Sequence, residues 1–299
     1  MGAVGCVLLL LVAYLGWLWS SYSKIQRVDL EGVLDEPTGD SLNYLLVGSD
    51  SRENLDPEAP DAAEPTVSGR RADTIILLRV GPGGSLMMSI PRDLWVTNPA
   101  TGDSGRINGT YNDGPANLVR AVRAELGVPV NHYMEVDFAS FAGLIDAVGG
   151  ITVEFPHPAF DRGSGLDVKT AGPVTLDGTQ ALAYVRARNY TEIIDGEQVK
   201  DPTADLGRQE RQRAFLVTAL SEVGSERNPI AMGRAAAALS GGLTVDTGFG
   251  FADALSLVRR LGGTTPQTVV LPTEGARKGG ASVLVLLEDE AAPVLSRFG

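Results

Sequence analysis

Apolar stretches of two kinds alternate along the chain and predict a mixed arrangement of strands and helices. Short apolar runs typical of buried strands lie at 42–47, 74–80, 85–90, 133–138, 151–155, 269–272 and 283–287. Apolar residues at helical spacing predict helices at 116–126, 140–148, 180–185, 206–223, 231–239, 251–261 and 288–298. Residues 168–176 are expected to form a short hairpin. Because strands and helices alternate without a break in composition, the pattern predicts one α/β domain.

An uncharged apolar run begins this pattern, from Ala3 to Trp19, and Lys24 follows it. A helix rises about 1.5 Å per residue, so the run would span roughly 26 Å, slightly less than a bilayer core. The run therefore predicts a transmembrane anchor, with a cleaved signal peptide as the alternative. The expected organisation is an anchor over 1–23, a polar juxtamembrane linker over 24–40 and one soluble domain over 41–299.

Charge and residue content exclude several classes of protein. The net charge of −12 argues against a large nucleic-acid surface, because phosphate contacts need basic side chains. Cys6 is the only cysteine, which excludes a disulfide framework. The two histidines, His132 and His157, are too few for a three-histidine zinc site. A serine hydrolase is a minor alternative, since the loop at 102–105, Gly-Asp-Ser-Gly, is similar to the nucleophile loop of serine proteases and would need one of these histidines.

Candidate metal and phosphate ligands follow the predicted strands in the first half of the chain. Asp50 and Arg52 come directly after the first of these strands, at the sheet edge where open α/β sheets bind ligands. Asp73 precedes the next strand, and two carboxylates with open positions suit Mg²⁺. Arg92 and Asp93 follow the end of a third strand. Each feature alone also fits a capped turn or a surface ion pair.

A second group of arginines lies further along the chain. Arg186 and Arg188 follow a short predicted helix. Arg208 and Gln212 share one stripe of a long helix, and Arg211 borders that stripe. Such runs are most often solvated charged faces, but arginine also binds phosphate in a bidentate manner. Several arginines together with two candidate metal carboxylates suit a diphosphate ester, because both stabilise charge that develops in phosphoryl transfer.

The ordered set of these motifs resembles the LytR–CpsA–Psr family of bacterial cell-wall glycopolymer transferases. It begins with Leu-Leu-Val-Gly-Ser-Asp-Ser-Arg and continues with Arg-Ala-Asp-Thr-Ile and Ser-Ile-Pro-Arg-Asp. The matching pieces lie at 45–52, 71–75, 89–93, 106–108, 133–138, 147–150, 176–178, 181–188 and 205–212. No single piece is decisive, but their order is specific, and the predicted anchor before them also fits the family.

The resemblance implies an α/β fold, namely a single α/β/α layered domain with a mixed central sheet, preceded by one N-terminal transmembrane helix. It implies a phosphotransferase that moves a glycan 1-phosphate from a polyprenyl diphosphate carrier to a peptidoglycan sugar hydroxyl. The catalytic domain would lie outside the cytoplasmic membrane. The expected partners are the polyprenyl diphosphate-linked glycan, peptidoglycan and membrane lipid, with no nucleic acid.

The resemblance also implies roles for individual residues. Asp50 and Asp73 would carry Mg²⁺, with Mn²⁺ as an alternative metal. The side chains expected to hold the diphosphate are Arg52, Arg92, Arg186, Arg188, Arg208 and Gln212, and Arg106 lies where the family has a basic residue. The expected catalytic residues are Arg92, Asp93 and Asp50, and the general base stays open between Asp50 and Asp93.

Two further activities would use the same residues. A non-catalytic or regulatory wall protein would hold an anionic glycopolymer with the arginines, but it would not need the paired carboxylates. A polyprenyl diphosphate phosphatase would release the lipid-linked phosphate with water as the acceptor, as a side activity of the same site.

Overall fold

The structure is a computed structural model that describes residues 16, 19–20, 22–49, 72–202, 205–225, 228–261 and 265–299. Contacts between residues divide the chain into two compact units, a division that the sequence pattern did not predict. The sheet unit comprises 25–139, 242–260 and 266–299. The helical unit comprises 1–24, 140–241 and 261–265.

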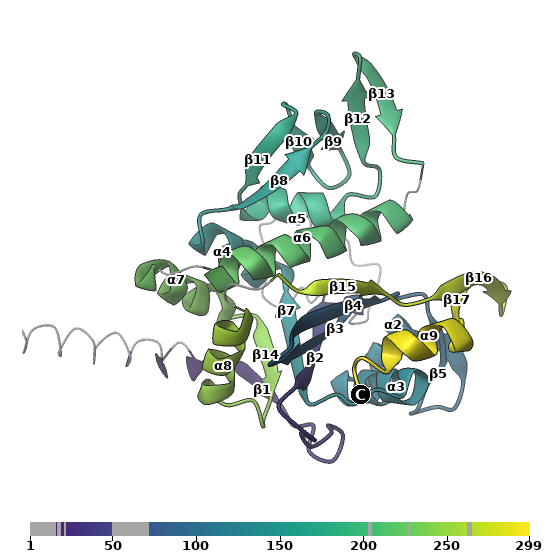
Figure 1. Cartoon of the computed structure of the whole chain (residues 1–299). Helices are drawn as coiled ribbons and strands as arrows, with labels where there is room; N and C mark the ends of the chain where they lie inside the picture. Colours follow the sequence, from purple (N-terminus) through teal and green to yellow (C-terminus); the bar gives the residue numbers. More distant parts are fainter. Residues whose placement is uncertain are drawn as a thin grey trace, which may run out of the picture. The chain divides into compact units, whose positions relative to one another are not determined.

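A seven-stranded mixed sheet forms the centre of the sheet unit (Figure 1). In spatial order its strands are β1 (Gln26–Val28), β14 (Leu243–Asp246), β7 (His132–Asp137), β2 (Leu42–Ser49), β3 (Ala72–Gly81), β4 (Gly84–Ile90) and β15 (Gln267–Val270). The pairs β1–β14, β7–β2 and β4–β15 are parallel, and the remaining neighbours are antiparallel. The prediction of a mixed α/β fold around a central mixed sheet is therefore confirmed.

Helices and short hairpins complete the sheet unit. They are β5 (Trp95–Thr97), β6 (Ser104–Arg106), α2 (Ile107–Thr110), η3 (Tyr111–Asp113), α3 (Pro115–Leu126), α8 (Phe251–Leu261), β16 (Thr273–Lys278), β17 (Ala281–Leu286) and α9 (Glu288–Leu295). Figure 1 shows α2, α3 and α9 gathered on one side of the sheet. Leu118 and Val122 of α3 and Ala291 of α9 join Leu45 and Leu77 of the sheet in one buried core. The helical spacing of these apolar side chains buries one face of α3 and leaves its polar face exposed.

The segment after Lys24 belongs to the sheet unit, although the sequence predicted a linker over 24–40. β1 pairs with β14, and Leu30 and Val33 are buried in the core. Although the stretch around them is polar, these apolar side chains lower the free energy of the folded chain when they are removed from water. The predicted anchor over 1–23 falls almost entirely on residues outside the described set. Among the described helices, none is both long and apolar enough to span a bilayer.

The helical unit contains two small sheets and several helices. Its elements are α4 (Phe138–Ala147), β8 (Ile151–Phe155), β9 (Ala159–Asp161), β10 (Leu166–Val168), β11 (Gly172–Leu176), α5 (Gly178–Arg186), β12 (Thr191–Ile194), β13 (Glu197–Lys200), α6 (Asp205–Ser225) and α7 (Pro229–Leu239). The predicted hairpin over 168–176 is wrong, because β10 pairs with β9 and β11 pairs with β8. The predicted range contains β11 but only the last residue of β10, and strand periodicity carries no information about the partner of each strand.

An aromatic core holds α5 and α6 together within the helical unit. The Tyr184 ring lies 6.0 Å from that of Phe215 and 5.4 Å from that of Phe155, measured between centroids. All three side chains are buried. This packing fixes the end of α5, which carries Arg186, against α6.

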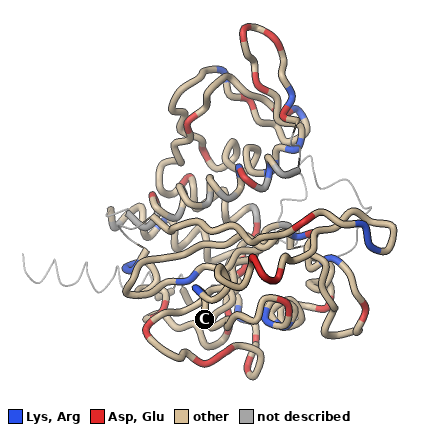
Figure 2. The backbone as a smooth tube through the Cα atoms, turned by 45° about the vertical axis from the view of Figure 1, so that its right-hand side comes forward, with Lys and Arg blue, Asp and Glu red and all other residues tan. Residues whose placement is uncertain are grey.

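Acidic positions are distributed over both units along the chain (Figure 2).

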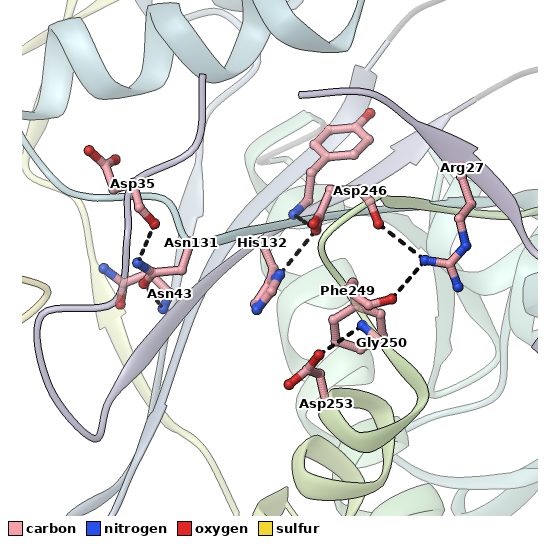
Figure 3. Close-up of polar contacts among 10 residues, drawn as sticks. Arg27, Asp35, Asn43, Asn131, His132, Asp246, Phe249, Gly250 and Asp253 are labelled. Atoms are coloured by element: carbon pink, nitrogen blue, oxygen red, sulfur yellow. Dashed lines mark hydrogen bonds and ion pairs between the residues drawn. The ribbon is translucent and has the colours of Figure 1, made fainter. Parts of the chain in front are cut away.

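Polar contacts join β1, β7 and β14 at one edge of the central sheet (Figure 3). Asp246 is 1% exposed, and its Oδ2 accepts a hydrogen bond from the Tyr133 main chain at 3.0 Å and lies 3.1 Å from Nδ1 of His132. The His132 ring meets Phe249 edge-on, and Arg27 Nη1 donates to the carbonyl oxygen of Phe249 at 2.8 Å. These contacts hold the His132 ring between Asp246 and Phe249.

Candidate active site

Two arginines and one carboxylate come together beyond the end of β4. Arg92 and Asp93 follow Pro91, and Arg106 is the last residue of β6. Asp93 Oδ1 lies 3.2 Å from Arg106 Nε, and Asp93 Oδ2 lies 3.8 Å from Arg92 Nε. The Arg92 side chain is 20% exposed and that of Arg106 is 42% exposed. The structure therefore brings together three of the predicted site residues, which come from two separate segments.

Main-chain contacts tie this cluster to the hairpin of β16 and β17. The carbonyl oxygen of Asp93 accepts a hydrogen bond from the Leu284 N–H at 3.0 Å. Arg106 Nη2 donates to the carbonyl oxygen of Ser282 at 2.8 Å. Both contacts are made by β17, which is about 180 residues later in the chain, so sequence spacing could not have revealed them. The guanidinium group of Arg106 is thus held between a carboxylate and a main-chain oxygen.

The predicted metal ligands belong to the neighbouring strand ends of β2 and β3. Asp50 and Arg52 lie outside the described residues. The pairing of β2 with β3 shifts after Gly48, and Asp73 is the extra residue at this bulge, beside the strand end that Asp50 follows. Two carboxylates at neighbouring strand ends are the donors that Mg²⁺ prefers, and the metal site stays a prediction. Among the described side chains, which exclude those of Asp50 and Asp73, no group of three or more His, Cys, Asp or Glu residues could hold a metal ion.

The helical unit carries the second group of predicted site residues. Asp177 caps α5 by accepting a hydrogen bond from the Gln180 N–H at 2.8 Å. Arg186 ends this helix, the next residue, Ala187, has an extended backbone, and Arg188 follows it. Both arginines are exposed, whereas Arg208 on α6 is 4% exposed.

Side chains of α6 hold the arginine segment, residues 185–188, through its main chain. Gln212 Nε2 donates to the carbonyl oxygen of Val185 at 2.8 Å. Arg211 Nη2 donates to the carbonyl oxygen of Ala187 at 3.0 Å. These two bonds flank Arg186, so α6 fixes the direction in which the segment leaves α5. Gln212 has a main-chain partner here, and its predicted contact with a diphosphate stays a prediction.

Arg211 is a residue to which the sequence analysis gave no role. Its Nη1 lies 2.6 Å from Asp201 Oδ2, and its guanidinium carbon lies 4.3 Å from the centre of the Tyr190 ring. Burial raises the pKa of Tyr190 above its ordinary value, so the ring stays neutral and offers its π face to the cation. The sequence showed only that Arg211 borders the stripe of Arg208 on the helix. Its partners lie outside that helix, so helical spacing could not reveal them.

Comparison with known proteins identifies the family of this chain. The model of the LytR_cpsA_psr family matches residues 20–297. The chain belongs to this family. The resemblance found in the sequence motifs is therefore confirmed, and the family match covers both the sheet unit and the helical unit.

Individual relatives and a solved structure agree with this assignment. A relative in Corynebacterium glutamicum, named "Probable cell wall biosynthesis protein LcpB", is 34% identical over 223 residues, 73% of this chain and 50% of the relative. A relative in Oceanobacillus iheyensis, named "Polyisoprenyl-teichoic acid--peptidoglycan teichoic acid transferase TagU", is 33% identical over 195 residues, 62% of this chain and 52% of the relative. The matches thus span about half the length of these relatives.

The structural comparison shows the same fold. The "LytR-Csp2A-Psr enzyme from Actinomyces oris" superimposes with a TM-score of 0.71 and 30% sequence identity. The match covers 92% of this chain and 96% of that one. The mixed α/β architecture with its central mixed sheet is therefore the architecture of a member of this family.

Proposed function

We propose that this protein is a transferase that attaches a glycopolymer to cell-wall peptidoglycan. Membership of the family supports this, as do the names of relatives that transfer teichoic acid to peptidoglycan. The observation that carries the proposal is the cluster of Arg92, Asp93 and Arg106 beside a strand end, in a chain of this family. Guanidinium groups held at such a place suit the oxygens of a diphosphate.

The proposed reaction is a phosphoryl transfer from a polyprenyl diphosphate-linked glycan. The acceptor sugar hydroxyl attacks the phosphorus atom that carries the glycan. The bond between that phosphorus and the bridging oxygen breaks, and polyprenyl monophosphate leaves. The hydroxyl proton passes to a carboxylate, either Asp50 or Asp93. The product is a phosphodiester between the glycan and the peptidoglycan sugar.

Arginines held in place before the reaction would stabilise the charge that develops on the phosphate oxygens. Arg92 and Arg106 take this role in the sheet unit. The contact of Asp93 with both guanidinium groups supports a positioning role for its carboxylate. The further diphosphate ligands proposed from the resemblance are Arg52, Arg186, Arg188, Arg208 and Gln212.

Asp50 and Asp73 are the proposed ligands of Mg²⁺, with Mn²⁺ as an alternative. When bound, the metal would supply Lewis-acid stabilisation of the phosphate oxygens. The proposal is supported by the bulge that makes Asp73 the extra residue beside the end of β2. The proposed location is outside the cytoplasmic membrane, with residues 1–23 as the anchor that keeps the domain near its lipid-linked donor.

The test is the metal dependence of turnover of a short-chain prenyl diphosphate sugar by the full chain in detergent. We expect turnover in Mg²⁺, a loss of about 100-fold or more in chelator, and recovery on adding Mg²⁺ or Mn²⁺. Asp73→Asn should lose turnover in the same way. Asp103→Asn is the matched control, since Asp103 is an exposed carboxylate of the same unit and has no predicted site role.

Equal rates with and without chelator would contradict the metal site. Tight binding of the donor without turnover in any metal would favour the non-catalytic glycopolymer-binding alternative. Turnover with water but not with a sugar acceptor would favour the phosphatase activity.

A further inference from the structure

The four-stranded sheet of the helical unit, β10–β9–β12–β13, has an inner face and an outer face (Figure 1). Ala159, Leu166 and Val168 are buried in the aromatic core of this unit and define the inner face. Because successive side chains of a strand point to opposite faces, Phe160 and Asp167 belong to the outer face. These two residues are directly paired between β9 and β10.

The strand register extends the outer face across β12 and β13. Phe160 is paired with Thr191 of β12 as well. Ile193 lies two residues further along β12, so its side chain is on the same face, and it is paired with Gln198 of β13. Directly paired residues carry their side chains on one face of a sheet. Phe160, Asp167, Ile193 and Gln198 are therefore neighbours on the outer face.

The outer face is hollowed, and we call this hollow the outer pocket. It has a volume of about 510 Å³, and its lining includes the four residues just named together with Arg162 and Lys169. Pockets that bind small ligands have volumes of about 300–1,000 Å³. Phe160 is half-buried and Ile193 is 37% exposed. An aromatic ring and an aliphatic side chain thus give the pocket an apolar surface.

Polar groups lie beside this apolar surface. The guanidinium carbon of Arg162 is 6.0 Å from the centre of the Phe160 ring, and Lys169 Nζ is 2.6 Å from Asp167 Oδ1. The side chains of Arg162 and Gln198 have no hydrogen-bond or ion-pair partner among the described residues. A guanidinium group donates, a carboxylate accepts and an amide does both. The pocket therefore offers both donors and acceptors to a ligand.

Contacts of Asp161 hold one wall of the outer pocket in place. Its Oδ1 accepts a hydrogen bond from the Gly163 N–H and its Oδ2 accepts one from the Asn189 N–H, both at 2.7 Å. The Gly165 N–H donates to the carbonyl oxygen of Asp161 at 2.9 Å. The loop after β9 is thus fixed before a ligand binds, which lowers the entropy cost of binding.

The charge of the lining favours an uncharged ligand. Asp161 and Asp167 are acidic, whereas Arg162 and Lys169 are basic, so their formal charges cancel. A phosphate or carboxylate ligand would need an excess of basic groups. A sugar ring has hydroxyl groups that donate and accept hydrogen bonds, and its C–H groups pack against an aromatic ring. The outer pocket matches both properties.

We propose that the outer pocket binds an uncharged sugar ring, which packs on Phe160 and forms hydrogen bonds with Arg162 and Gln198. This inference rests on the proposed function, in which two sugar chains are joined. The sources of such a ring are the peptidoglycan acceptor and the transferred glycopolymer. The outer pocket belongs to the helical unit, whereas the cluster of Arg92, Asp93 and Arg106 belongs to the sheet unit, so the pocket is a separate sugar site.

The test measures binding of two neutral tetrasaccharides to the full chain in detergent by titration calorimetry, without any donor. One probe consists of N-acetylglucosamine, as in the peptidoglycan backbone, and the other of galactose, which lacks the N-acetyl groups. Phe160→Leu keeps an apolar side chain but removes the ring, and should bind the preferred probe about tenfold or more weakly. Phe160→Tyr keeps the ring and should bind within about twofold of the unaltered protein.

A second variant tests the polar groups. Arg162→Gln/Gln198→Ala changes exposed side chains, so the fold should survive, and we expect binding about tenfold weaker. Arg234→Gln is the matched control, since it removes the same charge from an exposed position on α7 of the same unit, and it should bind like the unaltered protein. Thermal unfolding checks the fold of each variant.

A preference for either probe supports the inference and assigns the pocket to the acceptor or to the glycopolymer. No saturable binding of either probe up to about 10 mM would overturn it, as would unchanged affinity in both Phe160→Leu and Arg162→Gln/Gln198→Ala. Tighter binding of a glycerol phosphate oligomer, lost in the same variants, would replace the neutral sugar by an anion. Failure of the proposed function is distinguishable, because the unaltered protein would then not turn over a prenyl diphosphate sugar while tetrasaccharide binding persisted.

Discussion

Arg92→Ala is expected to lower kcat for transfer by about 10²–10³-fold, which corresponds to about 3–4 kcal/mol of transition-state stabilisation. Arg92 belongs to the pair of guanidinium groups around Asp93, and its side chain is only 20% exposed. A cation in such a partly desolvated place acts more strongly on developing charge than an exposed one. The variant keeps the contact of Asp93 with Arg106, so the local fold should survive.

Single-turnover kinetics with a prenyl diphosphate sugar measures this effect, and thermal unfolding checks the fold. Arg92→Lys should recover only part of the rate, because lysine keeps the charge but lacks the planar guanidinium group that binds phosphate in a bidentate manner. Arg120→Ala removes an exposed arginine of the same unit and should keep the full rate. An Arg92→Ala variant that folds normally and turns over within about twofold of the unaltered protein would remove Arg92 from the catalytic machinery.

Gly178→Ala is expected to destabilise the helical unit by about 3 kcal/mol or more, because the added methyl group has no space. Gly178 begins α5, and its N–H donates to Asp146 Oδ1 at 2.7 Å. A Cβ at this position would overlap the carbonyl oxygen of Ala142 and would lie 2.7 Å from its carbonyl carbon. These atoms belong to the backbone of α4 and cannot rotate away, so the two helices would have to separate. Since α5 ends at Arg186, the arginine segment would be displaced as well.

Thermal unfolding measures the stability effect, with an expected decrease in Tm of about 10–15 °C for a unit of this size. Gly241→Ala is the control, since a Cβ there would meet nothing within 4 Å. Its Tm should change by no more than about 2 °C. An unaltered Tm in Gly178→Ala would contradict the close approach of α4 and α5.

Hydrophobic periodicity predicted most elements because it reports which face of an element is buried. The strand at 151–155 and the helix at 251–261 have the predicted bounds. It could not predict which strands pair. β1 and β14 are short, and the residues predicted as one hairpin over 168–176 belong to two strands with other partners. Short strands with few apolar residues carry a weak signal, and their place is decided by partners far away in the chain.

The motifs identified candidate site residues, but they could not show which contacts hold them. Asp93 follows Arg92 in sequence, yet its shorter contact is to Arg106, which belongs to another segment. Arg211 could not be assigned from the sequence, because its role depends on Asp201, Tyr190 and a main-chain oxygen. Motifs report the chemistry of side chains, whereas the surrounding contacts depend on the tertiary fold.

The most direct test of the central claim follows the phosphorus atom bonded to the glycan. A prenyl diphosphate sugar labelled with radioactive phosphorus at that position is incubated with the full chain, Mg²⁺ and peptidoglycan fragments. We expect the label to become covalently bound to peptidoglycan, with release of an equal amount of unlabelled prenyl monophosphate, and Arg92→Ala should give neither product at a comparable rate. Label that stays in the donor, or that appears only as free glycan phosphate, would contradict transfer to peptidoglycan.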